Sequence, residues 1–244
     1  MRLLLLAGTQ EARQIARALM REPRVNMIAS LAGATRAPEP LGVPTRIGGF
    51  GGREGFARYL FDEGIDAVLD ATHPFAAEMS HRSAEVCAEL GVPFMLFLRP
   101  PWMPEPGDRW VFLNCAAEAA EHIPEDATVL LATGRQGLER FAGLEGRTVH
   151  VRVIDPPAGP FPFSRGGWVQ SRPPYSVAGE RDLLEALGID WLVVKNSGGS
   201  SSRAKLDAAR QTGRPVAMLR RPMQPEGPRV TTVAAALAWV RQLT

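Results

Sequence analysis

The sequence predicts an α/β fold of two Rossmann-like lobes, with mostly parallel sheets that face each other across a cleft. Short apolar runs alternate with segments of helical spacing throughout the chain, which is typical of βαβ units. The two halves also resemble each other, because GIDAVL at 64–69 is matched by GIDWLV at 188–193, and a later strand in each half runs into an Arg-Pro step. The alternative is one continuous large sheet.

The composition fits a globular chain with an ordinary hydrophobic core. Its 244 residues are 45% hydrophobic and 22% charged, which suits two compact lobes, predicted at 1–125 and 126–244. A net charge of only +2 argues against nucleic acid or a membrane as partner. The apolar run at 3–7 is shorter than the roughly 7 residues of a signal-peptide core, and no stretch nears the roughly 18 of a membrane span. We therefore expect a soluble, cytoplasmic protein.

The expected elements follow the apolar runs in chain order. Strands are predicted where such runs stand between turn signals, at 3–7, 25–32, 67–70, 94–98, 129–132, 148–153, 191–194 and 216–219. Helices are predicted where apolar residues recur every three or four positions, at 11–21, 53–63, 75–90, 138–142, 180–187, 203–211 and 233–243. The proline-rich stretches at 100–107, 155–162 and 172–175 are expected to be irregular, and the long loops of the second lobe to lie at the cleft.

Most strand ends of the first lobe are rich in glycine or hydroxyl groups, at the edge where open parallel sheets bind ligands. Glycine lets the backbone approach a phosphate, and a following helix offers free N–H donors. The first turn, Gly-Thr-Gln-Glu, lacks the GxGxxG fingerprint, so the interpretation as a nucleotide site rather than plain tight turns rests on these ends together. The candidate cofactor residues are Gly8, Thr9, Gln10, Ser30, Arg36, Gly49, Phe50, Thr72, His73, Pro74 and Phe75.

The end of the second strand indicates which dinucleotide binds. NAD-selective enzymes place an acid there to hold the ribose 2′-hydroxyl. This chain offers Ser30, Thr35 and Arg36 and has no acid before Glu39. A hydroxyl and a guanidinium attract a 2′-phosphate that a carboxylate would repel, so the sequence favours NADPH.

The histidines and cysteines do not point to metal or nucleophilic chemistry. We interpret His73 as the opening of a helix with Pro74 at its first position, in contact with the cofactor rather than catalytic. His81, His122 and His150 fit surface or strand positions. No spacing is typical of metal ligands, and neither cysteine stands in a CxxC motif.

A strand end of the second lobe carries both lysines of the chain, Lys195 and Lys205, in the stretch KNSGGSSSRAK. This polar turn before a helix is similar to a phosphate cradle but lacks the GxxxxGK[ST] order of ATP-binding loops. We interpret it as an anion-binding turn. The alternative is a solvated linker.

Several motifs, in this order, resemble the precorrin-6A reductase family, the NADPH-dependent enzymes of cobalamin biosynthesis. They are GT-x-E-x-R at 8–13, GGFGG at 48–52, DATHPFA at 70–76, RP-x-W at 99–102, TGR at 133–135, KNSGG at 195–199 and RP at 221–222. The resemblance spans nearly the whole chain, and DATHPFA and KNSGG together are specific. The family more often has Asp where this chain has Asn196, which argues against proton transfer by that side chain.

The resemblance implies NADPH on the first lobe and a tetrapyrrole in the cleft, where hydride reduces a carbon–carbon double bond of precorrin-6A to give precorrin-6B. The precorrin is a polyanion with acetate and propionate arms, and each charge-assisted hydrogen bond to it contributes about 1.5–3 kcal/mol. The candidate substrate residues are Arg99, Trp102, Arg135, Tyr175, Lys195, Asn196, Ser197, Gly198 and Arg203. Lys195 is also the candidate catalytic residue, as an ammonium that stabilises charge or donates a proton. Transient contacts with neighbouring pathway enzymes are a further expectation.

Two other classes of protein share a two-lobed α/β architecture. A glycosyltransferase would need a carboxylate site for a sugar nucleotide in the second lobe, and we find none in the sequence. A solute-binding protein is normally exported, and we find no signal sequence. We therefore expect an NADPH-dependent oxidoreductase acting on CH–CH groups, with a glycosyltransferase or another nucleotide-dependent transferase as the alternative.

Overall fold

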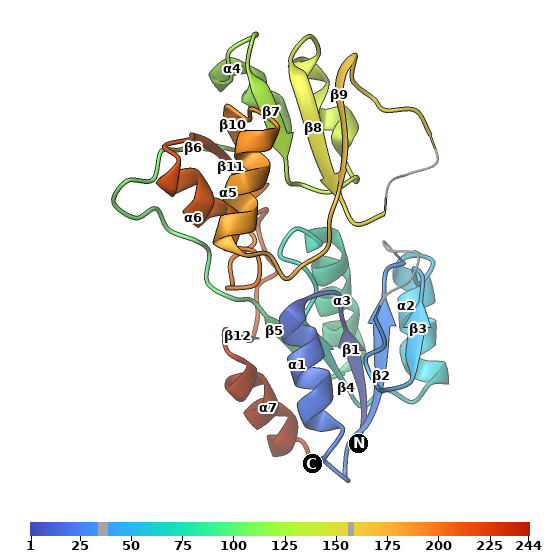
Figure 1. Ribbon diagram of the computed structural model, residues 1–244. Coiled ribbons are helices and arrows are strands. Elements are labelled where there is room, and N and C mark those ends of the chain that lie inside the picture. Colours follow the sequence, from blue (N-terminus) through green and yellow to red (C-terminus); the bar gives the residue numbers. More distant parts are fainter. Residues whose placement is uncertain (34–38, 156–158) are drawn as a thin grey trace. The chain divides into compact units, whose positions relative to one another are not determined.

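The chain forms two compact units, each built around its own sheet of six parallel strands (Figure 1). The computed structural model describes residues 1–33, 39–155 and 159–244. Unit 1 comprises Met1–Pro100 and Pro222–Thr244, and unit 2 comprises Pro101–Arg221. The prediction of an α/β class with two Rossmann-like units is confirmed.

Unit 1 has the strand order of a doubly wound dinucleotide-binding domain. Its strands are β1 (Arg2–Leu6), β2 (Asn26–Leu31), β3 (Thr45–Ile47), β4 (Ala67–Asp70), β5 (Phe94–Phe97) and β12 (Arg229–Val230), arranged as β12-β5-β4-β1-β2-β3. Its helices are α1 (Gln10–Leu19), α2 (Gly52–Asp62), α3 (Ala77–Leu90) and α7 (Val233–Gln242). The order reverses between β1 and β4, and such a switch point is where open α/β sheets bind ligands.

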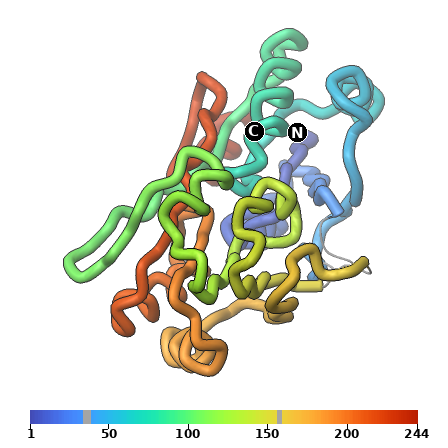
Figure 2. Tube along the Cα trace, turned by 90° about the horizontal axis from the view of Figure 1, so that it is seen from above, coloured from blue at the N-terminus to red at the C-terminus, as the bar shows by residue number. Residues whose placement is uncertain are grey.

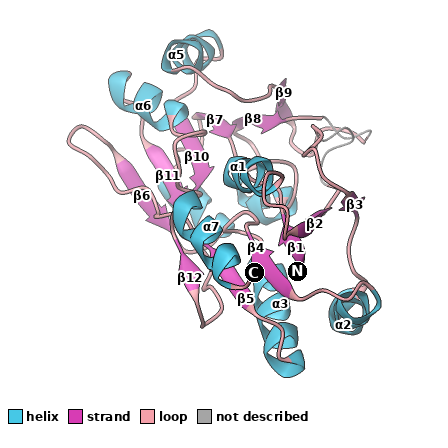
Figure 3. Cartoon of the chain, turned by 90° about the horizontal axis from the view of Figure 1, so that it is seen from below, coloured by secondary structure: helices cyan, strands magenta, loops and turns pink. Residues whose placement is uncertain are grey.

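Helices cover both faces of the unit 1 sheet, which explains why β1 is apolar throughout. Leu3 and Leu5 pack with α1 and α7 on one face, and Leu4 and Leu6 pack with α2 and α3 on the other. The helices α1 and α7 lie side by side (Figures 1 and 3). Because α7 belongs to the end of the chain, the two termini also lie close together (Figure 2).

Unit 2 repeats this arrangement with different helices. Its strands are β6 (Trp110–Leu113), β7 (Thr128–Leu131), β8 (Thr148–Val153), β9 (Arg165–Gln170), β10 (Trp191–Lys195) and β11 (Val216–Leu219), arranged as β6-β11-β10-β7-β8-β9. Its helices are α4 (Ala119–His122), α5 (Val177–Ala186), α6 (Ala204–Gln211) and the 3-10 helices η1 (Ala116–Glu118) and η2 (Leu138–Leu144). The switch point of this sheet lies between β7 and β10.

One edge strand of each unit comes from the part of the chain that follows the other unit. After β5 the chain leaves unit 1, and β6 pairs with β11 in unit 2. After β11 it returns, and β12 pairs with β5 in unit 1 (Figure 3). The two repeated Arg-Pro steps are these crossing points. The units therefore end elsewhere than at the expected 125/126 division, because the sheet that a strand joins is set by pairing and not by its position in the chain.

The predicted elements are present, and the strands that were not predicted lie at the sheet edges. Each predicted strand is found within one residue of its expected ends, whereas β3, β6, β9 and β12 were not predicted. These four strands are the edges of the two sheets. An edge strand buries less apolar surface, so its apolar run is short and its pattern is weak. The expected helix at 138–142 is a 3-10 helix with non-helical dihedral angles at Phe141.

Candidate cofactor and substrate sites

The turn between β1 and α1 lies at the switch point of unit 1 and suits a phosphate. Gly8 has a φ of +135°, and a Cβ added there would meet no described atom within 4 Å, so the backbone is open to a ligand. Thr9 caps α1, because its Oγ1 accepts the N–H of Ala12 at 3.1 Å, and the same hydroxyl donates to the Ala71 carbonyl at 2.8 Å. Gln10 is exposed at the first position of α1. The first N–H groups of a helix have no partner within it, which favours an anion here.

Arg46 ties the end of β2 to the glycine-rich loop before α2. Its Nη1 donates to Ser30 Oγ and to the Gly48 carbonyl, both at 2.9 Å, and its Nη2 donates to the Gly49 carbonyl at 2.8 Å. Its Cζ lies 3.8 Å from the centre of the Phe50 ring. Three predicted cofactor residues thus gather around an arginine that the sequence analysis missed. The only sequence signal for this arginine is its position two residues before the glycine run.

The predicted 2′-phosphate residue Arg36 lies outside the described residues, as does Thr35. Arg46 is a described arginine in direct contact with the end of β2, where a 2′-phosphate would bind.

The turn after β4 is held by its own side chains. Asp70 is fully buried, its Oδ1 accepts the N–H of Thr72 at 2.9 Å, and burial raises the pKa of its carboxyl group. His73 Nδ1 accepts the N–H of Phe75 at 3.2 Å, and Pro74 is buried within the turn. The interpretation of Pro74 as the first helical residue is wrong, because the ring of His73 holds this turn and α3 begins only at residue 77.

Arg99, predicted to bind substrate, lies in unit 1 and pairs with Glu11 in the first turn of α1. Its Nη1 is 2.7 Å from Oε2 of Glu11, and both side chains are largely buried. Burial lowers the pKa of the guanidinium, and Glu11 opposes that effect. The pair neutralises a carboxylate that would otherwise repel an anion at the start of α1.

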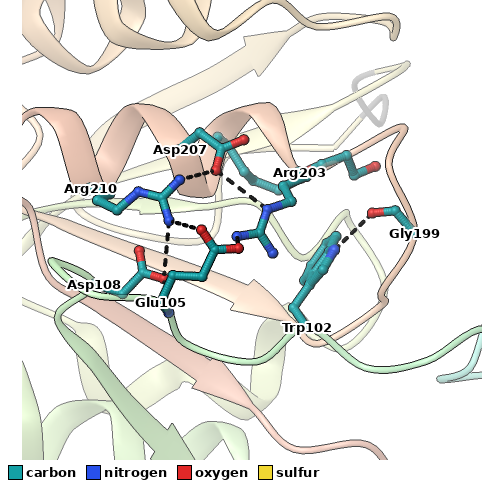
Figure 4. A network of polar contacts seen from close by, with 9 residues as sticks. Trp102, Glu105, Asp108, Gly199, Arg203, Asp207 and Arg210 are labelled. Carbon is teal, nitrogen blue, oxygen red and sulfur yellow. Dashed lines mark hydrogen bonds and ion pairs between the residues drawn. The ribbon is translucent and has the colours of Figure 1, made fainter.

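The turn after β10 is held by hydrogen bonds to Trp102, in the segment that enters unit 2. The Asn196 side chain accepts the N–H of Trp102 at 2.8 Å and donates to the carbonyl of Trp102 at 3.0 Å. Trp102 is only 4% exposed, and its indole N–H donates to the Gly199 carbonyl at 2.8 Å (Figure 4). Arg221 donates to the carbonyls of Asn196 and Ser197 at 2.7 and 3.0 Å. Trp102, which belongs to the core of unit 2, therefore supports this turn through its contacts with Asn196 and Gly199.

Arg203 belongs to a network of ion pairs that fastens the entering segment to α6 (Figure 4). Its guanidinium contacts Glu105 and lies 3.4 Å from Asp207. Arg210 contacts the same Glu105 and lies 2.8 Å from Asp207. A substrate carboxylate at Arg203 would therefore have to compete with Glu105.

The remaining turn residues lie at the carboxyl edge of the unit 2 sheet. Lys195 ends β10 and is half-buried, and burial, together with repulsion from Arg140, lowers the pKa of its ammonium group. Arg135 lies in the turn after β7, the strand that neighbours β10. Ser197 and Gly198 are buried in the turn after β10. The switch point of unit 2 thus carries two cations beside an open glycine, Gly134, whereas that of unit 1 carries the open Gly8 at the start of an α-helix.

The described part of the chain holds no group of three or more His, Cys, Asp or Glu side chains placed to bind a metal ion. Burial raises the pKa of the Cys87 thiol to about 12, which keeps it protonated and unreactive. Within residues 1–33, 39–155 and 159–244, no helix combines the length and the apolar character needed to cross a bilayer.

Comparison with known proteins decides the family. Residues 2–241 match the family model described as "Precorrin-6x reductase CbiJ/CobK". The chain belongs to this reductase family. A precorrin-6A reductase of Rhodococcus erythropolis is 44% identical over 246 residues, which cover 100% of this chain and 98% of the relative. A cobalt-precorrin-6A reductase of Priestia megaterium is 26% identical over 90% of both chains. A solved structure, "CobK precorrin-6A reductase", has a TM-score of 0.94 and 40% identity, covering 99% of this chain and 96% of that chain.

Membership of the precorrin-6A reductase family makes the chain an oxidoreductase of cobalamin biosynthesis that acts on a carbon–carbon double bond of the macrocycle. The family and the activity class expected from the DATHPFA and KNSGG motifs are confirmed. A full-length match of this kind does not favour a glycosyltransferase or a solute-binding protein.

The chain also holds a buried charged cluster around Arg152 and Glu180, two residues that the sequence analysis did not assign to the site. Arg152 in β8 pairs with Glu180 in α5, and Tyr175 lies with its ring centre 4.8 Å from the Cζ of Arg152. Lys205 in α6 is buried beside them. Arg152 was missed because it alternates with buried valines along β8, a pattern that also fits a side chain facing solvent.

Proposed function

We propose that this chain transfers a hydride from NADPH to a carbon–carbon double bond of metal-free precorrin-6A and so yields precorrin-6B. The family match over residues 2–241 carries this proposal. The metal-free substrate is supported by the greater identity to the relative named precorrin-6A reductase than to the one named cobalt-precorrin-6A reductase. We also place the enzyme in the cytoplasm, where transient contacts with neighbouring pathway enzymes would pass on its substrate and product.

The residues of unit 1 fit a dinucleotide. The open Gly8 turn at the switch point leaves room for a pyrophosphate against the backbone, and α1 directs its N-terminus to the same place. Thr9 holds this turn to the end of β4 through the Ala71 carbonyl. NADPH, when bound, supplies the hydride. The turn formed by Thr72, His73, Pro74 and Phe75 is proposed to lie under the dinucleotide.

Arg46 is proposed to receive the 2′-phosphate, with Arg36 as the second candidate. A guanidinium has five N–H donors, and three of those of Arg46 are engaged with Ser30, Gly48 and Gly49. The remaining donors leave Arg46 able to bind a phosphate oxygen at the end of β2. Stacking on Phe50 holds the guanidinium plane in place.

Unit 2 is proposed to bind the acidic arms of the macrocycle and to supply the proton that accompanies the hydride. Reduction of the double bond places a hydride on one carbon and a proton on its neighbour. Lys195 Nζ is the proposed donor or charge partner, since its lowered pKa makes the ammonium a stronger acid. Arg135, Ser197 and Gly198 are proposed to contact substrate carboxylates. Trp102 and Asn196 are proposed to act as positioning residues, because their contacts hold the turn.

The test is an anaerobic assay of NADPH oxidation with three acceptors. We expect rapid loss of NADPH absorbance with precorrin-6A, a much slower loss with cobalt-precorrin-6A, and no reaction with a UDP-sugar. Equal rates with the two precorrins would contradict the metal-free assignment. No NADPH oxidation with either precorrin would contradict the proposed reaction.

A further inference from the structure

Unit 2 contains buried hydrogen-bonding groups that have no partner among the described residues. Arg152 is 7% exposed, and its Nη1 lies 2.9 Å from both carboxylate oxygens of Glu180. Its Nε and Nη2 are buried and make no hydrogen bond within the described part of the chain. The hydroxyl of Ser171 is buried and unpartnered in the same way. Unmet polar groups of this kind are costly, so several together call for an explanation.

The sheet register places these groups together. Arg152 in β8 lies beside Val169 in β9, and the ladder continues from Val153 to the N–H of Ser171. Side chains two residues apart on a strand share one face, so Ser171 lies on the same face of the sheet as Arg152. Nε and Nη2 of an arginine present two parallel N–H groups, which is the geometry that binds both oxygens of one carboxylate.

The charges of the cluster do not balance. Arg152 and Lys205 are cations, and Glu180 is the carboxylate that pairs with Arg152. Lys205 is 7% exposed, and its Nζ donates to the Ser202 carbonyl at 2.7 Å. Burial and the charge of Arg152 lower the pKa of Lys205 to about 8, against the opposing effect of Glu180. A bound water could satisfy the hydrogen bonds, whereas a bound anion would satisfy them and also compensate the excess positive charge.

We propose that Arg152, Ser171 and Lys205 form a receptor for one carboxylate group, and that the carboxylate is an acidic arm of the precorrin. The second part rests on the proposed function. The half-buried Tyr175 lies beside this receptor, with the centre of its ring 4.8 Å from the Cζ of Arg152. The receptor uses groups of unit 2 alone.

The test exploits the presence of only two lysines in the whole chain. Protein labelled with ¹⁵N and ¹³C in lysine gives two side-chain signals by NMR, and the Lys195→Arg variant identifies the signal of Lys205. The pKa of Lys205 is then measured with acetate, with chloride at the same ionic strength, and with precorrin-6A. Acetate tests binding of a free carboxylate, precorrin-6A tests binding of an arm of the macrocycle, and chloride measures the effect of ionic strength alone.

We expect acetate and precorrin-6A each to raise the pKa of Lys205 by about 1 or more, since a nearby carboxylate favours the ammonium. Chloride should leave it nearly unchanged. An equal response to acetate and chloride, or no response to either, would overturn the receptor. A response to acetate without a response to precorrin-6A would overturn the assignment to an arm. Neither result depends on turnover, so NADPH oxidation by the wild-type protein tests the proposed function separately.

Variants assign the receptor to its residues. Arg152→Gln should abolish the response to acetate and weaken precorrin-6A binding at least about tenfold. Because loss of Arg152 leaves Glu180 unpaired and could impair folding, Ser171→Ala provides a milder test, with a response reduced but still measurable. Arg181→Gln on the outer face of α5 is the matched control and should behave as wild type. An undiminished response in both Arg152→Gln and Ser171→Ala would overturn the site.

Discussion

The two switch points share one strand arrangement and differ in the turn and helix that come after the first strand. In unit 1, β1 leads through Gly8 directly into α1, an α-helix of ten residues capped by Thr9. In unit 2, β7 leads through a longer turn into η2, a 3-10 helix that begins only at Leu138 and is interrupted at Phe141. In the neighbouring turn after β10, the carbonyls of Gly199 and Asn196 accept hydrogen bonds from Trp102 and Arg221.

This difference shows that the internal repeat preserved the sheet and not the site. A helix N-terminus at a switch point is a ready anion site, and unit 1 has kept one beside an open backbone. Unit 2 offers cationic side chains instead, at Lys195, Arg135 and the Arg152 cluster. This contrast supports the proposal that the dinucleotide binds to unit 1 and the carboxylates of the substrate bind to unit 2.

The largest effect on NADPH binding is expected when a glycine at the switch point of unit 1 is replaced, in comparison with a glycine of unit 2. Gly8→Val places a branched side chain where the pyrophosphate should lie and should weaken NADPH binding at least about 100-fold, or about 2.7 kcal/mol. Gly134→Val, after β7, is the matched control, since Gly134 also has a positive φ and open space around its missing Cβ. Calorimetry should find NADPH affinity within about twofold of wild type for that variant. An equal loss of NADPH affinity in both variants would contradict the proposal that only unit 1 binds the dinucleotide.

The next effect concerns the buried charge of unit 2. The folded pKa of Lys205, about 8, lies below the ordinary lysine value of 10.5, so the folded state binds fewer protons than the unfolded state between these limits. Wild-type stability should therefore rise with pH across this window relative to Lys205→Met, by about 1–3 kcal/mol. Urea unfolding of both proteins at pH 7 and pH 10 measures this difference in stability. Cys87 is present in both proteins, so its titration does not contribute to the difference. A difference independent of pH would contradict the buried ammonium.

A third prediction concerns the hydrogen bonds between Asn196 and Trp102 in unit 2. Asn196→Ala removes both hydrogen bonds to Trp102 and should lower the free energy of unfolding by about 2–3 kcal/mol. Asn196→Asp keeps the acceptor for the Trp102 N–H and loses the donor to its carbonyl, so about 1 kcal/mol is expected. Denaturant unfolding measures both. No loss of stability in Asn196→Ala would mean that the amide does not bridge the Trp102 peptide groups.

The smallest expected effect concerns cofactor choice in unit 1. We expect NADPH to bind about tenfold tighter than NADH, about 1.4 kcal/mol, and Arg46→Gln to remove most of that preference. Arg36→Ala measures how much Arg36, the second candidate for the 2′-phosphate, contributes to the preference for NADPH. Arg58→Gln on the exposed face of α2 is the control. Titration with 2′,5′-ADP and 5′-ADP isolates the 2′-phosphate from the rest of the dinucleotide. An unchanged preference in Arg46→Gln would move the phosphate away from this arginine.

The parts of the fold that were predictable are those where burial leaves a clear pattern. The central strand at Leu3–Leu6 is apolar because both of its faces are covered, and the open glycine turn after it could be predicted from the residue types alone. The edge strand β9 begins with Arg-Gly-Gly and buries little, so its sequence carries no strand signal. The exchange of β6 and β12 depends on pairing between distant segments, which local patterns do not record.

The same contrast holds for the site residues. Thr9 was predicted at the turn before the first helix, and the structure shows that it caps that helix. Trp102 and Arg203 were predicted to bind substrate, and in the fold they contact Asn196, Gly199 and Glu105, which are distant from them in sequence. Whether a cation is already paired is a property of the folded chain.

Hydrogen exchange with and without saturating NADPH tests the central assignment most directly, because it reports the backbone N–H groups of both units in one experiment. We predict slower exchange at residues 8–13 and 71–76 of unit 1 and unchanged exchange at 133–138 and 196–202 of unit 2. Protection of the unit 2 turns with no change at the Gly8 turn would contradict the assignment of the dinucleotide to unit 1.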